Sequence, residues 1–416
     1  MLTVLLNGQV IGDLEGAGKR LRLYYYPDAI GQPEFVPLST GMPATQPRWR
    51  GDRVANWLEG LLPEREAVLR RWRAQFGITD LHPESLLAHI GEDVAGAAQF
   101  VRKDRLESVL RGEGDLQPLS EAEVADLVRA AYQDVLPFSV EAATGQFSLA
   151  GAQAKFALQR LGDGWAVPAG AQPSTHIFKP AVPGFADQDV TEVLSMRLAA
   201  QVGLATAHAF VTAFASQRVI VVERYDRVQV RGQWVRVHQE NLCQVAGLAP
   251  LRKYESQGGL GASACADLIR RHCGAVDVER FAQAVIYNYL VRGSDAHAQN
   301  YSLLITPSSV RLAPLYDLNS TLTFGHNFAN EMAMRVGGET RFDRIGRADW
   351  EQFAREAGLE PEWVLSQLND MAGRLPGALA EVRADADLAP FREAGAMFQD
   401  RLAEWLKVSA ATRRHK

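Results

Sequence analysis

The chain begins with a pattern of apolar positions that is typical of β-strands. Apolar runs at 2–6 and 9–14 flank Asn7-Gly8, a dipeptide that favours the positive φ angles of a two-residue type I′ turn. These features predict an N-terminal β-hairpin. Two further strands are expected in this part of the chain, LRLYYY at 21–26 and EFVPLS at 34–39.

Helical spacing of apolar residues then replaces the strand pattern. It is present at 53–76 and again at 119–133. Ser120 and Glu123 have the spacing of a capping box, in which each side chain satisfies a backbone N–H of the other residue. The second helix is therefore expected to begin just after Ser120.

The remainder of the chain divides into a β-rich part and a helix-rich part. Strand-like runs at 175–180, 219–228 and 234–242 surround one helix that is expected to end at Gly203. Beyond Leu242 the spacing is mainly helical. The expected divisions are an α/β module at 1–110, a helical connection at 111–145, a β-rich lobe at 146–242 and a helical lobe at 243–416.

Composition and charge fit an ordinary globular protein. The chain has 44 basic and 49 acidic residues and a net charge of -5, so its overall charge does not predict attraction to nucleic acid or acidic membranes. Three cysteines are too few for a disulfide framework, which favours a reducing compartment. Charged residues interrupt every apolar stretch before the roughly 18 residues of a membrane helix, and no signal peptide is recognised. We expect a cytoplasmic protein with no membrane span.

The most informative segment is Asp295-Ala-His-Ala-Gln-Asn300, between a predicted helix at 280–293 and a predicted strand at 301–305. In protein kinases, a loop in this context carries an aspartate that accepts the substrate hydroxyl proton and, five positions later, a metal-binding asparagine. Asp295 and Asn300 have this separation, and Asp317 is expected to end the second strand of the pair that follows. Phosphoryl transfer needs such a carboxylate and hard oxygen ligands for Mg²⁺. The segment therefore predicts phosphoryl transfer.

Two upstream features are consistent with a phosphate-binding site. Lys179 is expected at the end of a strand, where its ammonium would reach the phosphates of ATP, with Glu192 on the next helix as its ion-pair partner. Taken alone, Glu192 is better explained as a surface residue of that helix. The small residues of 148–155 allow backbone amides to approach phosphate oxygens closely, although the segment is also compatible with an ordinary hairpin turn.

Six motifs in this order resemble the signature segments of HipA-type serine/threonine kinases, the toxins of bacterial toxin–antitoxin pairs. The resemblance extends over nearly the whole chain, and it implies an α+β, bilobal protein-kinase-like fold. In that fold a β-rich N-lobe is extended by the N-terminal α/β module, and the C-lobe is helical. The HRD and DFG strings of eukaryotic-type kinases are absent. The six motifs are SLAGAQAKFAL, HIFKP, HQENLCQVAG, KYESQGG, SDAHAQN and PLYDLNST.

The resemblance implies ATP and Mg²⁺ as cofactors and a role for each matching residue. Asp295 matches the proton acceptor, Asn300 and Asp317 match the Mg²⁺ ligands, and Lys179 matches the phosphate-binding lysine. His297 and Tyr316 match positions near the nucleotide without an assigned role, and His297 is equally explained as a structural histidine. The remaining matches are the phosphate loop (Ala150, Gly151, Ala152, Gln153, Ala154, Lys155), the linker that binds adenine through its backbone (Glu240, Asn241, Leu242) and the autophosphorylated serine (Ser148).

The resemblance also implies partners. Members of the family phosphorylate an aminoacyl-tRNA synthetase, glutamyl-tRNA synthetase in the best-known case, and thereby halt translation. They bind a small HipB-like helix-turn-helix antitoxin that takes the pair to operator DNA. With a net charge of -5, this chain is expected to leave most of the DNA affinity to the antitoxin.

Three other interpretations are open from the sequence. Asp295 and His297, together with Asp317 or His326, are compatible with a metal-dependent hydrolase, although Asn300 and Lys179 would then have no role. A pseudokinase that acts only as an antitoxin partner or repressor is disfavoured by the complete set of kinase-like residues. A zinc site is weaker still, because its spacing is unlike that of structural zinc sites; its ligands would be Cys265, His272 and Cys273.

Overall fold

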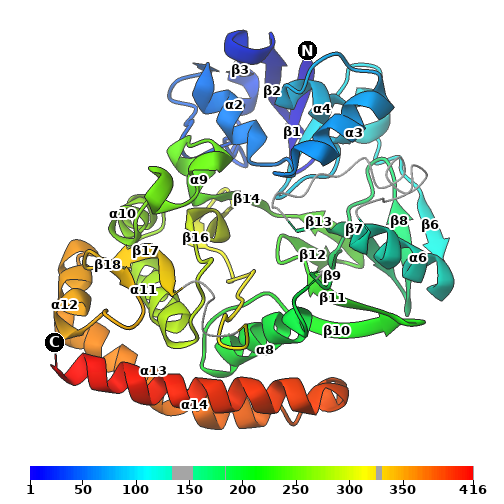
Figure 1. Ribbon diagram of the computed structural model, residues 1–416. Coiled ribbons are helices and arrows are strands. Elements are labelled where there is room, and N and C mark those ends of the chain that lie inside the picture. Colours follow the sequence, from blue (N-terminus) through cyan, green and yellow to red (C-terminus); the bar gives the residue numbers. More distant parts are fainter. Residues whose placement is uncertain (134–152, 183, 325–329, 416) are drawn as a thin grey trace. The chain divides into compact units, whose positions relative to one another are not determined.

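The computed structural model describes residues 1–133, 153–182, 184–324 and 330–415 of the chain (Figure 1). The chain forms two compact units, each made of segments that are far apart in the sequence. The first unit contains 1–180, 213–250 and 303–310; the second contains 181–212, 251–302 and 311–416. Among the described helices, none combines the length and the apolar character needed to cross a membrane.

The first unit begins with a five-stranded antiparallel sheet in the order β4-β3-β2-β1-β5. Asn7 and Gly8 connect its first two strands with φ angles of 52° and 75°, so the predicted hairpin is confirmed. The strands are β1 (Leu2–Leu6), β2 (Gln9–Glu15), β3 (Arg22–Tyr25), β4 (Arg48–Arg50) and β5 (Ala98–Val101). The helices of this part are α1 (Pro27–Ile30), α2 (Asp52–Glu59), α3 (Glu66–Phe76), α4 (Pro83–Ile90) and α5 (Leu106–Leu110).

The strand expected at 34–39 does not form. The backbone N–H of Leu38 donates to the hydroxyl of Tyr25 over 3.0 Å, and that hydroxyl donates to the carbonyl oxygen of Met42 over 2.9 Å. Pro37 has no N–H to offer a neighbouring strand. The segment therefore wraps around the buried Tyr25 side chain, and the strand prediction was wrong because its apolar pattern reflects this burial.

A second sheet has the order β10-β11-β9-β7-β8-β6. The helix α6 (Glu121–Tyr132) packs against β9 and β11, and the predicted capping box of Ser120 and Glu123 is present. The segment 111–145 was expected to be a helical connection, but it also supplies the edge strand of this sheet. The strands are β6 (Leu116–Leu119), β7 (Phe156–Leu161), β8 (Gly164–Pro168), β9 (His176–Pro180), β10 (Ala209–Phe214) and β11 (Gln217–Glu223).

The last part of the first unit is a two-stranded ribbon, β12 (Arg227–Val230) and β13 (Gln233–Arg236), followed by β14 (His238–Asn241) and helix α9 (Leu242–Ala246). Strand β14 belongs to a three-stranded sheet with β15 (Ser302–Ile305) and β16 (Val310–Leu312). Along these two strands the chain leaves the second unit after residue 302 and returns to it at residue 311.

A buried network of charges joins this ribbon to the N-terminal part of the first unit. Asp93 accepts hydrogen bonds from Arg227 at 2.8 Å and Arg236 at 3.1 Å, and Asp226 accepts one from Arg224 at 2.9 Å. The side chains of Asp93, Asp226, Arg224 and Arg227 are each at most 4% exposed. Burial alone would raise the pKa values of the two aspartates, but the arginines lower them below the ordinary range, so both remain ionised.

The second unit is mainly helical. In Figure 1 the long helices α13 and α14 run side by side, and both pack against α8. Tyr289, Phe342, Trp350 and Trp405 form an aromatic cluster in its core. The elements are α8 (Gln188–Gln201), α10 (Ala262–His272), α11 (Ala275–Leu290), β17 (Glu331–Val336), β18 (Glu339–Arg341), α12 (Arg347–Glu356), α13 (Pro361–Val382) and α14 (Arg392–His415).

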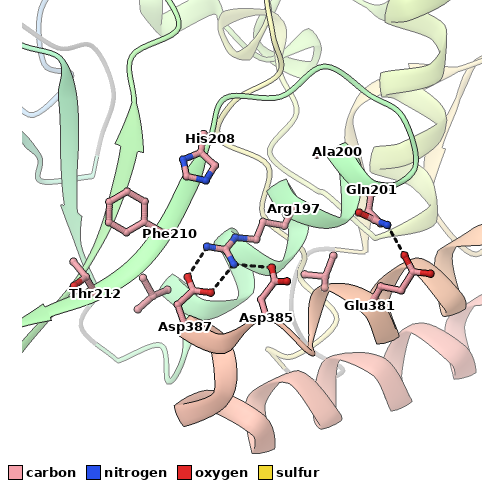
Figure 2. A pocket seen from close by; sticks show the side chains of 11 residues that line it. Arg197, Ala200, Gln201, His208, Phe210, Thr212, Glu381, Asp385 and Asp387 are labelled. Atoms are coloured by element: carbon pink, nitrogen blue, oxygen red, sulfur yellow. Dashed lines mark hydrogen bonds and ion pairs between the residues drawn. The ribbon is translucent and has the colours of Figure 1, made fainter.

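Helix α8 is fixed to the second unit by polar contacts as well as by packing. Figure 2 shows Arg197 between Asp385 and Asp387, to which its guanidinium donates over 2.8 and 2.5 Å. The hydroxyl of Tyr287 donates to the Ser195 carbonyl over 2.5 Å. The arginine and the two aspartates line a hollow of about 760 Å³, and because the arginine is paired with both aspartates, we regard the hollow as part of this contact between α8 and residues 385–387.

Candidate active site

The predicted catalytic segment lies in a tight loop directly after α11. The helix ends at Leu290, and Arg292 then adopts a left-handed conformation with a φ of 53°. The N–H of Gly293 donates to the Asn288 carbonyl over 2.7 Å, and a Cβ at position 293 would lie only 2.3 Å from Asn288 Oδ1. A glycine is therefore required where the chain turns toward Asp295.

Asp295 and Asn300 are brought together by hydrogen bonds within the loop. Asn300 Nδ2 donates to the carbonyl oxygen of Asp295 over 2.9 Å, and the N–H of His297 donates to the same oxygen over 2.8 Å. Asn300 lies in a short 3₁₀ turn and is 9% exposed, whereas the Asp295 side chain is 59% exposed. The loop therefore presents the Asp295 carboxylate to solvent and uses the Asn300 amide nitrogen internally, so the amide oxygen is the Asn300 group that could bind a cation.

Tyr254 is a further component of the site. Its hydroxyl donates to Asp295 Oδ1 over 2.5 Å, and its ring contacts the ring of the buried His297 edge-on, with centroids 4.8 Å apart. The Lys253 ammonium lies 5.4 Å from the centre of the Tyr254 ring. The sequence motif KYESQGG contains both residues, but neither was assigned a role, because nothing local indicates that they reach a residue 41 positions away. Tyr254 holds one carboxylate oxygen and leaves the other for a substrate.

The surroundings of Asp295 raise the pKa of its carboxyl. Desolvation by neighbouring atoms is the largest cause, and the negative charge of Asp317 adds to it. The hydrogen bond from Tyr254 and the positive charge of Lys253 act in the opposite direction. A carboxylate with a raised pKa is a better proton acceptor at neutral pH, as general-base catalysis requires.

We expect Tyr254→Phe to change the pH dependence of phosphoryl transfer. The hydrogen bond from Tyr254 lowers the pKa of Asp295. Its loss in the variant therefore raises that pKa further, and Asp295 becomes protonated at a higher pH. The acidic limb of the kcat/KM profile should move to higher pH. Tyr132→Phe is the control, because Tyr132 is an exposed residue of α6 and its loss should leave the profile unchanged. An unchanged acidic limb would show that Tyr254 does not tune Asp295.

Asp317 lies in a different local structure from the one predicted. The strand expected to end at Asp317 stops at Leu312, and Asp317 has a left-handed φ of 57°. The intervening chain leaves its partner strand because the Leu315 N–H donates to the Ala205 carbonyl over 2.8 Å. The prediction that a strand positions Asp317 was wrong, but Asp317 is still close enough to affect the pKa of Asp295.

Tyr316 also holds the loop of Asp295 and Asn300 in place. Its hydroxyl donates to the Gln299 carbonyl over 2.8 Å and lies 2.7 Å from the hydroxyl of Ser302. Since the tyrosine proton is used on Gln299, Ser302 is the donor in the second contact. Tyr316 therefore holds the chain on both sides of Asn300, and its predicted place near a nucleotide stays a prediction.

The donor set fits Mg²⁺. Burial is the largest cause of the raised pKa of Asp295, and the negative charge of Asp317 adds to it; a cation held by Asp317 and Asn300 would offset that charge. The Asp317 carboxylate and the Asn300 amide supply hard oxygen ligands of the kind that magnesium prefers.

The described residues also bear on the alternative metal sites. Cys265 is buried with its Sγ 3.7 Å from Met334 Sδ, and burial raises the pKa of the Cys273 thiol to about 12. In the part of the chain that the structure describes, no group of three or more Cys, His, Asp and Glu side chains is placed to hold a metal, which argues against the zinc interpretation. His326, considered for a hydrolase site, lies outside the described residues.

The predicted phosphate-binding residues of the first unit lie near one another. Lys179 is a 6% exposed residue of β9, and Gln153 Nε2 donates over 3.0 Å to the carbonyl oxygen of Pro180, the next residue along that strand. Ala154 and Lys155 lead from Gln153 into β7. Four residues of the predicted loop lie outside the described residues: Ser148, Ala150, Gly151 and Ala152.

Glu192 belongs to the second unit, whereas Lys179 belongs to the first. Glu192 is 1% exposed on α8, and Gln188 donates a hydrogen bond to its carboxylate over 3.2 Å. The interpretation of Glu192 as a surface residue was therefore wrong. Its predicted ion pair with Lys179 stays a prediction.

The predicted adenine linker runs from the end of β14 into α9. Asn241 caps this helix, with its Oδ1 accepting from the Gln244 N–H over 3.0 Å, and Leu242 is the buried first residue of the helix. The Glu240 side chain points into the first unit and accepts hydrogen bonds from Thr40 and Trp57. The role of this backbone in adenine binding stays a prediction.

Comparison with known proteins places the chain in a family. The family models described as HipA N-terminal domain and HipA-like C-terminal domain match residues 2–101 and 147–379, the second of which is more than half of the chain. The chain belongs to the HipA family. The family expected from the sequence motifs is thereby confirmed.

Individual relatives match this HipA-family protein over nearly its whole length. It is 32% identical over 391 residues to the putative kinase Y4mE of Sinorhizobium fredii, with 92% of each chain covered. It is 28% identical to the serine/threonine-protein kinase toxin HipA of Shewanella oneidensis, with 92% of this chain and 89% of the relative covered. A structure of Shewanella oneidensis HipA with HipB and its operator DNA matches with a TM-score of 0.83 and 26% identity, covering all of both chains. The expected α+β, kinase-like fold is confirmed.

Proposed function

We propose that this HipA-family protein is an ATP- and Mg²⁺-dependent serine/threonine kinase and the toxin of a toxin–antitoxin pair. The observation that carries the proposal is the arrangement around Asp295. A carboxylate with a raised pKa is presented to solvent, one of its oxygens is held by Tyr254 at 2.5 Å, and Asn300 is tied to the same loop at 2.9 Å. The relatives named as kinases support this interpretation.

In the proposed reaction, Asp295 accepts the proton of the substrate hydroxyl while the hydroxyl oxygen attacks the terminal phosphorus of ATP; the bond from that phosphorus to the bridging oxygen breaks, and ADP leaves. Tyr254 orients the carboxylate, and Tyr316 keeps the loop on both sides of Asn300 in place. Asn300 and Asp317 would hold Mg²⁺, which supplies positive charge at the phosphates when it is bound. Lys179 would contact the phosphates of ATP.

We infer a protein substrate that is an aminoacyl-tRNA synthetase, with glutamyl-tRNA synthetase as the first candidate, so that phosphorylation inhibits translation. This inference is based on the six sequence motifs and on the curated relative named as a kinase toxin. The partner would be a HipB-like helix-turn-helix antitoxin, as in the matched complex with HipB and operator DNA. With a net charge of -5, this chain would contact DNA mainly through the antitoxin.

We further propose that Ser148 is autophosphorylated and that this modification inactivates the protein. A phosphate would add about -1.5 to -2 charges to the segment that is predicted to hold the phosphates of ATP. Two anionic groups would then compete for the same backbone amides and for Lys179. Loss of nucleotide affinity is the expected consequence.

Incubation of the purified protein with labelled ATP and glutamyl-tRNA synthetase tests these proposals. We expect label on the synthetase only when Mg²⁺ is present, and peptide mapping should place label on Ser148 of the kinase itself. Titration with a nucleotide should then show weaker binding by the Ser148-modified form. Absence of any transfer would contradict kinase activity, whereas transfer without modification of Ser148 would contradict only the self-inactivation.

A further inference from the structure

The N-terminal part of the first unit makes an extensive contact with the segment 238–247, which comprises β14, α9 and Gly247. The buried His238 lies at the beginning of this contact, where its Nε2 is 3.0 Å from the Leu38 carbonyl oxygen and the Ala97 N–H donates to its Nδ1 over 3.4 Å. Burial lowers the pKa of His238 to about 4, so the ring is neutral and Nε2 carries the donated proton.

The carboxylate of Glu240 is the centre of the contact. It is 1% exposed, and its Oε1 accepts from the N–H and the hydroxyl of Thr40, each over 2.7 Å. Its Oε2 accepts from Trp57 Nε1 over 2.9 Å. Burial raises the pKa of Glu240, and these donors oppose that effect. Because a buried carboxylate needs such donors, Thr40 and Trp57 fix the position of β14 at the residue where the linker begins.

The next residues of the segment are held in the same way. Gln244 Nε2 donates to the Trp57 carbonyl over 2.9 Å, and Asn56 Nδ2 donates to the Gly247 carbonyl over 2.8 Å. Arg53 donates to the Val245 carbonyl over 3.3 Å. The last carbonyls of a helix have no partner within the helix, so side chains of α2 supply the partners that α9 lacks.

Two glycines of the N-terminal module lie so close to the backbone of 238–247 that this segment has little room to shift. A Cβ at Gly41 would lie 2.2 Å from the carbonyl oxygen of Val245, and a Cβ at Gly96 would lie 2.7 Å from the backbone nitrogen of Gln239. Both positions therefore exclude any side chain. The N-terminal module is packed onto the backbone of 238–247 on either side of the predicted linker.

We propose that four residues of the N-terminal module that contact this segment, Thr40, Arg53, Asn56 and Trp57, are positioning residues for the nucleotide. The side chains of the first three are only partly buried. This inference rests on the proposed function, because the nucleotide would be bound by the backbone of residues 240–242. The hydrogen bonds of a linker to adenine depend on where its backbone lies, and displacements of about 1 Å are enough to weaken them. The module thus sets the affinity for ATP without touching it.

Thr40→Val tests the proposal, because it removes one hydroxyl donor to Glu240 and leaves the backbone N–H. Thr3→Val is a matched control, since Thr3 donates over 3.0 Å to the buried Asp13 in the same module, which also accepts from Tyr26. We expect the Kd for the Mg²⁺ complex of a non-hydrolysable ATP analogue to be about tenfold larger in Thr40→Val and unchanged in Thr3→Val. The KM for ATP should rise while kcat stays within about twofold.

Asn56→Ala provides a second variant at a partly exposed position, where failure to fold is not expected, and its Kd should change in the same direction. Equal Kd values for wild type, Thr40→Val and Asn56→Ala would overturn the inference and leave the proposed function standing. The same loss of affinity in Thr3→Val would overturn it as well, because the effect would then be general destabilisation. If the wild type neither binds the analogue nor transfers phosphate, the proposed function fails and this inference fails with it.

Discussion

The Asp295→Asn variant is expected to lose phosphoryl transfer by about 10²–10⁴-fold, the usual contribution of a positioned general base. Asparagine keeps the size of the side chain and can still contact the Tyr254 hydroxyl, but it cannot take the proton of the substrate. Because the Asp295 side chain is 59% exposed, the fold should be unaffected. Transfer of label from ATP to protein measures the effect, and a thermal melt checks the fold.

Asp267→Asn is a suitable control for this experiment. Asp267 is also exposed in the second unit, where it forms an ion pair with Arg270 on the same helix. This variant should transfer phosphate at the wild-type rate. Near wild-type transfer by Asp295→Asn would contradict the assignment of Asp295 as the base.

The Asp93→Asn variant is expected to lose about 3–5 kcal/mol of stability, the cost of breaking a buried ion pair by removing one partner. Asp93 accepts hydrogen bonds from the N–H and hydroxyl of Ser174, at 2.9 and 2.6 Å, as well as from Arg227 and Arg236. Without its charge, three arginines would share the single carboxylate of Asp226. Urea unfolding, monitored by tryptophan fluorescence, measures the loss.

The pH dependence of stability gives an independent check on this network. The pKa of Asp226 is lowered to about 2, and that of Asp93 is also lowered. A lowered pKa means that the stabilisation is fully present above the unfolded-state value of about 4 and is lost as pH falls toward the folded-state value. Wild type should therefore lose stability between about pH 4 and pH 2, and Asp93→Asn should lose less. The control Asp104→Asn, in an exposed pair with Arg102, should leave both stability and its pH dependence unchanged.

Local chemistry in the sequence was sufficient for several elements. Asn7-Gly8 determines its turn through its own φ angles, and Ser120 and Glu123 cap a helix through groups only three residues apart. The loop of Asp295 and Asn300 also closes on itself, since Asn300 bonds the Asp295 carbonyl. These features depend on neighbours along the chain, which a sequence pattern can represent.

Other features depend on partners that are distant in the sequence. Thr40 lies 200 positions from Glu240, whose side chain holds the N-terminal module rather than remaining beside the linker. The apolar pattern of 34–39 was mistaken for a strand because the Tyr25 hydroxyl takes the Leu38 N–H. The sequence favours a surface position for Glu192, because a charged residue on a helix normally faces solvent. In each case a tertiary contact determined the outcome.

The position of α8 has a consequence for dividing the protein into fragments. Eleven of its fourteen residues are buried, among them Gln188, Asp189 and Glu192, so the helix has no broad polar face to turn toward water. Its partners are α13, α14 and the Asp385–Asp387 segment, all in the C-terminal third of the chain. A fragment that ends near residue 242 would contain this helix without them. Such a fragment should aggregate when expressed alone, and adding residues 251–416 on a second chain should restore its solubility.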